Sequence, residues 1–256
     1  MRNSDLGRMG QAKILKENFL REHPRCFACG EPSVEWDHLP SRACFDNKEW
    51  PEGFCFPVCY SCNHATSNDE QIIAALSRTH SGPDAPINNA ELAKYLAGSS
   101  NNDPALFGKL LSRVAQELPD GTELIELGPG VREVFQRVLP KWARAFHYLE
   151  TGEILPTDQR IFGSHMTLPD LQRGRGPTGL FECCIPRPVM RAKKDLSPQF
   201  GFARAVSSDR KLFAYIALFR RSIGAWMVVD KNEEVHRSGP EVDFSILPPV
   251  RSLGGK

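Results

Sequence analysis

Residues 26–69 read CFACGEPSVEWDHLPSRACFDNKEWPEGFCFPVCYSCNHATSND and contain two Cys-x-x-Cys pairs. Four thiolates of this kind can bind Zn²⁺ tetrahedrally, with Zn–S distances of about 2.3 Å. The alternatives are redox dithiols or the disulfides of a secreted protein. No segment resembling a signal peptide precedes the cysteines, and a second matched pair favours a metal. We therefore expect a structural zinc ion held by Cys26, Cys29, Cys59 and Cys62.

The long gap between the two pairs predicts a folded insertion. Residues 33–39 and 54–58 each read as a short strand, and the segment after Cys59 has no early helix breaker. The expected order is therefore knuckle, strand, strand, helix, with the metal joining the two ends of the unit.

The dipeptide Asp37-His38 lies at the end of the first expected strand. A carboxylate suits a hard divalent cation, and a neutral imidazole suits a general base. Adjacent strand residues point to opposite faces, so the two side chains need not share one role. Asn63 directly follows the last cysteine of the second pair, where its amide oxygen can complete a metal site with Asp37.

This pattern resembles the HNH endonucleases, which are ββα-metal nucleases built on a treble-clef zinc core. The resemblance implies that Asp37 and Asn63 are catalytic ligands of Mg²⁺ or Mn²⁺ and that His38 activates water. It also implies hydrolysis of DNA, with RNA as a second possible substrate. His64 is an alternative ligand, and its imidazole would favour a softer metal such as Mn²⁺, Ni²⁺ or Zn²⁺.

The chain departs from the family pattern at two places. No Asn occurs in residues 52–56, where the family usually has its middle Asn, and Asp46 and Asn47 are the nearest substitutes. Thr66 stands where a Lys is often found. A noncatalytic zinc module that binds nucleic acid or protein, such as a degenerate copy, is therefore the alternative. A third is a zinc fold that serves only the C-terminal part.

The remaining sequence predicts an α+β protein with an HNH-like module (1–80), a helical region (81–150) and a β-rich C-terminal domain of unknown role (151–256). Ser67 and Glu70 have the spacing of a capping box. The apolar spacing predicts helices over 9–22, 67–78, 89–97, 103–118 and 130–150. Antiparallel strands are expected over 201–206, 212–220 and 223–229, with the second one central.

Composition limits the partners. The chain is 41% hydrophobic and 25% charged and has no apolar run that could cross a bilayer, so a cytoplasmic protein without a membrane role is expected. Residues 1–150 hold 16 Lys/Arg against 20 Asp/Glu, and residues 151–256 hold 16 against 11. The C-terminal part is thus favoured for phosphate contacts. The other four cysteines are expected to be buried thiols: Cys44, Cys55, Cys183 and Cys184.

One further basic face is predicted. Lys141, Arg144 and His147 share a face of the helix expected over 130–150, where the two cations could contact nucleic acid and His147 is expected to pack. The sequence gives no indication of the oligomeric state.

Overall fold

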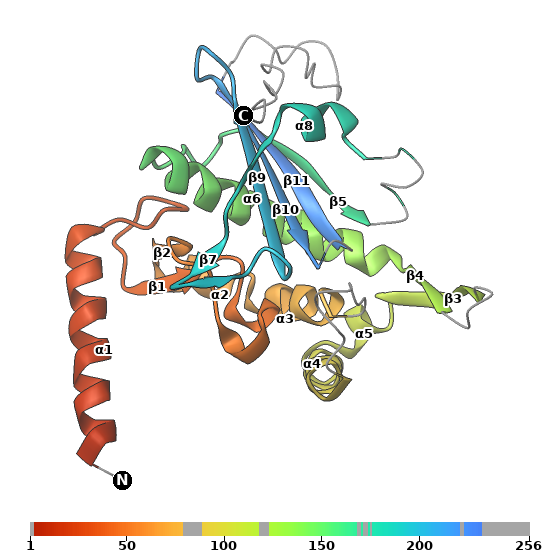
Figure 1. Ribbon diagram of the computed structural model, residues 1–256, viewed down its shortest axis with the longest axis horizontal. Helices are drawn as coiled ribbons and strands as arrows, with labels where there is room; N and C mark the ends of the chain where they lie inside the picture. The colour runs from red at the N-terminus through yellow and green to blue at the C-terminus, as the bar shows by residue number, and fades with distance from the viewer. Residues whose placement is uncertain are drawn as a thin grey trace.

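The computed structural model describes residues 3–78, 89–117, 123–167, 170, 174, 176–220 and 223–231 of a mixed α+β chain (Figure 1). The helices are α1 (Asn3–Glu22), α2 (Tyr60–His64), α3 (Ser67–Leu76), α4 (Asn89–Asn102), α5 (Pro104–Phe107), α6 (Pro129–Thr151) and α8 (Thr178–Cys183), with 3-10 turns η1 (Arg42–Cys44) and η2 (Asp46–Lys48). The strands are β1 (Glu35–His38), β2 (Cys55–Val58), β3 (Leu111–Glu117), β4 (Glu123–Leu127), β5 (Ile161–Thr167), β6 (Ile185–Arg187), β7 (Met190–Arg191), β8 (Lys194–Asp195), β9 (Phe200–Val206), β10 (Leu212–Phe219) and β11 (Ile223–Asp230).

The N-terminal module has the predicted order of knuckle, hairpin and helix. β1 and β2 pair antiparallel, with Asp37 opposite Phe56 and His38 opposite Cys55. The Phe27 amide donates to the Pro57 carbonyl at 2.9 Å, which joins the first knuckle to β2. Gly30 closes that knuckle at φ +78°, a conformation that favours glycine.

The C-terminal sheet has the strand order β5-β11-β10-β9-β6 and is antiparallel throughout. The predicted strands and the central position of β10 are confirmed. Phe213 and Tyr215 point into one buried cluster, and Leu212 and Ala214 point into another. Because α6 packs against one face and α8 against the other, β10 is apolar on both faces (Figure 1).

Helix α6 lies between this sheet and the zinc module. Its apolar stripe is buried as predicted and includes Val131, Val134, Phe135, Val138, Trp142 and Phe146. Each such side chain contributes about 1.5–3 kcal/mol of stability. The expectation that Lys141 and Arg144 contact nucleic acid is wrong, because both are buried. The face of α6 that carries Lys141 and Arg144 is covered by other parts of the protein, as its apolar face is, so it points into the protein. His147 is packed inside, as expected.

Two predicted elements differ from the structure. The helix expected over 103–118 ends at Phe107, and residues from Leu111 form the β3–β4 hairpin instead. Antiparallel pairing of β3 with β4 outweighs the helical spacing of this segment. Ser67 is not a cap: it is the first residue of α3, and its hydroxyl donates to the His64 carbonyl.

Helix α1 starts earlier than predicted and contacts the zinc module near its C-terminal end. The Phe19 ring meets Trp36 of β1 at a centroid distance of 5.9 Å. Ile14 and Leu15 of the expected apolar stripe are exposed. One buried cluster contains side chains from all three predicted regions, so the boundaries at 80 and 150 stay predictions. Within the described residues, no helix has the length and apolar character needed to cross a membrane.

Candidate metal centre

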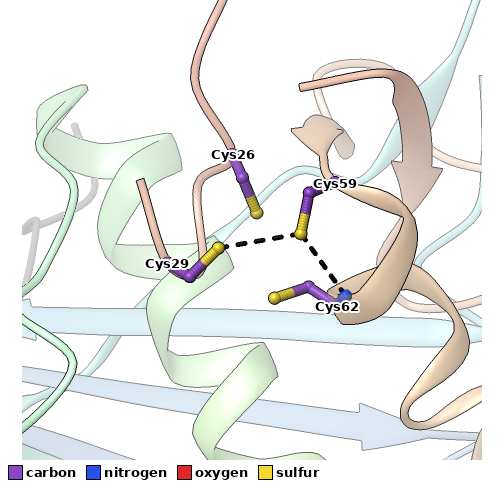
Figure 2. A group of neighbouring side chains, drawn as sticks. All are labelled: Cys26, Cys29, Cys59 and Cys62. Carbon is purple, nitrogen blue, oxygen red and sulfur yellow. Dashed lines mark hydrogen bonds between the residues drawn. The ribbon is translucent and has the colours of Figure 1, made fainter. Parts of the chain in front are cut away.

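The four predicted zinc ligands come together at one point. Figure 2 shows the sulfurs of Cys26 and Cys29, from the first knuckle, facing those of Cys59 and Cys62, from the start of α2. All four Sγ atoms lie within 4.8 Å of one another, and Cys29 Sγ is 3.7 Å from Cys59 Sγ. A ZnS₄ tetrahedron with bonds of about 2.3 Å has S–S edges of about 3.8 Å. The group therefore fits Zn²⁺.

The surroundings of Cys59 favour its thiolate, whereas burial raises the pKa of Cys29 and Cys62. Burial raises the pKa of Cys59, but hydrogen bonds from the Ser61 hydroxyl and the Cys62 amide outweigh it and lower the pKa to about 6. Burial lowers the pKa of Arg144, while the nearby Cys62 and Cys29 act in the opposite direction. A buried guanidinium beside the four sulfurs would offset the negative charge of a Zn–thiolate centre.

The other cysteines are separate from this centre. Cys44, Cys183 and Cys184 are buried, and Cys55 is half-buried. Burial raises the pKa of Cys44 to about 12 and that of Cys55 to about 11, so both remain thiols at neutral pH. Among the described residues, Cys26, Cys29, Cys59 and Cys62 form the one group suited to a metal.

Asp37 lies in a buried charged group that we call the inner cluster: Asp37, Thr66, Glu70 and Lys141. The Lys141 ammonium of α6 is 2.7 Å from Asp37 Oδ2 and 2.9 Å from Glu70 Oε1. It also donates to the Thr66 hydroxyl, which in turn donates to Glu70 at 2.8 Å. A lysine from a distant helix thus supplies the positive charge next to Asp37.

Burial dominates the electrostatics of the inner cluster. It raises the pKa of Asp37 and raises that of Glu70 to about 6, and in both cases Lys141 opposes the rise. Burial alone would lower the pKa of Lys141, but Glu70 and Asp37 raise it instead. Lys141 therefore stays protonated and is the permanent counter-ion of the two carboxyl groups.

The two predicted ligands on α2 are also engaged elsewhere. The Asn63 amide donates to a Glu35 carboxylate oxygen in β1. The His64 ring stacks on Tyr60 at a centroid distance of 4.0 Å, and its Nδ1 is 2.9 Å from the Tyr60 carbonyl oxygen. Asp46, a substitute for the missing Asn, pairs with Arg220 next to the sheet at 2.7 Å.

His38 lies in a second group that we call the outer surface: Trp36, His38, Arg42, Trp50 and Arg191. The His38 ring meets Trp50 at a centroid distance of 4.4 Å. The guanidinium carbons of Arg42 and Arg191 lie 4.2 and 3.8 Å from the centroid of the Trp50 ring. Burial, and then the charges of Arg42 and Arg191, lower the pKa of His38 to about 4.

The structure thus joins the four cysteines but gives the three predicted catalytic residues different partners. Asp37 contacts Lys141, Asn63 contacts Glu35, and His38 contacts Trp50. Sequence reasoning missed Lys141 as the partner of Asp37 and missed Trp50 and Arg191 entirely. The one local feature that pointed to a member of the inner cluster was the capping-box spacing of Ser67 and Glu70, which predicted a contact of Glu70 at the start of its helix.

Comparison with known proteins adds no relative. No protein-family model matches the chain, and no curated protein or solved structure matches it. The resemblance to HNH endonucleases therefore rests on the motif alone.

Proposed function

We propose that this chain is a zinc-stabilised nucleic-acid-binding protein in which the HNH-like motif contacts phosphodiesters without hydrolysing them. DNA is the expected partner, with RNA as the alternative. The observation that carries the proposal is the position of Lys141, whose ammonium lies 2.7 Å from the carboxylate that a catalytic metal would need. A divalent ion at Asp37 would have to displace a buried cation that is already paired with two carboxyl groups.

The outer surface supports the binding part of the proposal. Arg42 and Arg191 place two positive charges beside His38, whereas the chain as a whole carries a net charge of only +1. Attraction of a polyanion would therefore come from this local group rather than from a global field.

Metal-dependent hydrolysis of DNA is the second candidate. It is favoured by His38, because a pKa near 4 keeps the imidazole neutral and able to accept a proton at neutral pH. In this candidate His38 takes a proton from water, while Asp37 and Asn63, or Asp37 and His64 in place of Asn63, hold Mg²⁺ or Mn²⁺. Lys141 would first have to release Asp37.

One pair of measurements separates the candidates. The zinc-loaded full-length protein is tested for nicking of supercoiled plasmid with Mg²⁺ or Mn²⁺ and for DNA binding by fluorescence anisotropy. We expect binding without nicking. Nicking that His38→Ala abolishes would replace the proposal with the hydrolytic candidate, whereas nicking of equal rate in His38→Ala would indicate a contaminating nuclease. Absence of binding to both DNA and RNA would refute the proposal.

A further inference from the structure

We infer that the outer surface binds single-stranded nucleic acid, with bases stacked on Trp50 and its guanidinium neighbours and phosphate oxygens at Arg42, Arg191 and His38. The inference rests on the proposed function and names the form of nucleic acid. Its starting point is Trp50, a half-exposed indole in contact with two cations and an imidazole.

The outer surface is assembled from two distant parts of the chain. Arg191 belongs to the β7–β8 hairpin, which docks on the loop before β2 (Figure 1). The Glu52 amide donates to the Met190 carbonyl at 2.9 Å, and the Ala192 amide donates to the Glu52 carboxylate at 2.9 Å. Lys194 also pairs with Glu49. These contacts hold Arg191 over Trp50 before any ligand arrives, so little ordering is required on binding.

The two guanidinium groups of the outer surface favour binding of an anion. Arg42 donates from Nε to the Lys48 carbonyl and is exposed, while Arg191 is half-buried. Within the described residues, neither guanidinium forms an ion pair with a carboxylate. Two cations that share one ring repel each other, and a phosphate oxygen between them would relieve that repulsion and form charge-assisted hydrogen bonds. The neutral His38 ring adds one donor for the same anion.

The aromatic side chains of the outer surface favour contact with a nucleic-acid base. The His38 ring contacts both Trp36 and Trp50 edge-on, at centroid distances of 6.3 Å and 4.4 Å and interplanar angles of 63° and 72°. Bases of single strands stack on aromatic rings and on guanidinium planes, and a guanidinium over an indole extends that platform. In a duplex both faces of each base are already stacked. A duplex would therefore use the cations alone, which predicts a preference for single strands.

The test uses the zinc-loaded full chain without added divalent metal. Anisotropy measures binding of a fluorescein-labelled oligodeoxythymidine of about 12 nucleotides, a duplex of equal length, and unlabelled thymidine monophosphate as competitor. We expect the single strand to bind at least about tenfold more tightly than the duplex. Trp50→Ala should weaken single-strand binding by about five- to a hundredfold, and Trp50→Phe, which keeps a ring, should restore most of it.

The charged residues have their own readout. With about two phosphates neutralised, log Kd against log salt concentration has a slope of about 1.4 for a single strand. Arg191→Ala should lower this slope by about 0.7, because one phosphate contact is lost. Phe181→Ala, an exposed aromatic on α8, and Arg132→Ala, an exposed arginine on α6, are the matched controls and should leave affinity and slope unchanged.

The outcomes also separate this inference from the proposed function. Equal binding of duplex and single strand, or full single-strand affinity in a folded Trp50→Ala variant, would overturn the inference and leave nucleic-acid binding intact. Absence of binding to any oligonucleotide would overturn both. Thymidine monophosphate that competes as well as the oligonucleotide at equal nucleotide concentration would mean a site for free nucleotides, and the inference would fail.

Discussion

Asp37 and His38 are neighbours in sequence, yet they lie in opposite environments. Asp37 is enclosed by α3 and α6, where its side chain is 12% exposed and Lys141 of the same protein neutralises it. His38 lies on the half-exposed outer surface, beside two guanidinium groups that have no carboxylate partner within the described residues. The difference indicates that the two side chains of this dipeptide have separate roles: Asp37 takes part in a buried ion-pair network, and His38 belongs to the surface for which we propose nucleic-acid binding.

Removal of the zinc ion should destabilise both the inner cluster and the outer surface, because the centre joins the first Cys-x-x-Cys knuckle to the start of α2. Apparent Zn²⁺-binding free energies in zinc-finger peptides are about 10–16 kcal/mol. We expect one zinc per chain by elemental analysis and loss of cooperative thermal unfolding in Cys59→Ser or after chelation. Cys55→Ser is the matched control, since Cys55 lies outside the four-sulfur group, and it should retain the metal. Full zinc content in Cys59→Ser would contradict this assignment.

Lys141→Met should damage the inner cluster alone. Loss of one partner of a buried ion pair leaves an uncompensated charge and costs about 3–5 kcal/mol. Urea unfolding measures the effect. Arg42→Met on the outer surface is the control and should change the free energy of unfolding by less than about 0.5 kcal/mol. Equal stability of the two variants would contradict the view that the inner cluster stabilises the fold and the outer surface does not. Asp37→Asn with Glu70→Gln should restore part of the stability lost in Lys141→Met.

Glu70 should give the inner cluster a characteristic pH dependence. Its pKa is raised to about 6 from 4.5, so folding favours the protonated acid. The stability that this provides is complete below pH 4.5 and is lost as the pH rises through 6. The stability of the wild type relative to Glu70→Gln should fall by about 2 kcal/mol over that range. Denaturant titrations of both proteins at several pH values measure the difference, and a constant difference would count against the buried acid.

His38 should show a pH dependence of the opposite sign. Its pKa is lowered to about 4, so folding favours the neutral ring. This contribution is present above pH 6.5 and is lost as the pH falls through 4. NMR titration of the imidazole should give a pKa near 4, and Arg42→Ala with Arg191→Ala should raise it only in part, because burial is the larger cause. A pKa near 6.5 in the wild type would mean that His38 is solvated.

The features that could be predicted from sequence depend on local spacing. Two Cys-x-x-Cys pairs imply four sulfurs, and short apolar runs bounded by polar turn residues imply β9 to β11, because each pair and each run is recognised from neighbouring residues alone. The partner of Asp37 could not be predicted, since Lys141 lies 71 residues after Glu70 and reads as a surface cation on its helix. Arg191 meets Trp50 only through tertiary docking of a two-residue strand. The helical spacing of residues 111–117 does not predict β3, because the pairing of this strand with β4 decides its conformation.

The source of the lysine in the inner cluster limits how this motif can be reused. A fragment ending near residue 78 would keep every residue that resembles a nuclease, including Asp37 and Glu70. It would lack α6, and with it the ammonium that makes burial of those acids tolerable. The nuclease-like segment is therefore not self-sufficient. A design that places it in another scaffold would also have to supply a buried cation next to the two acids.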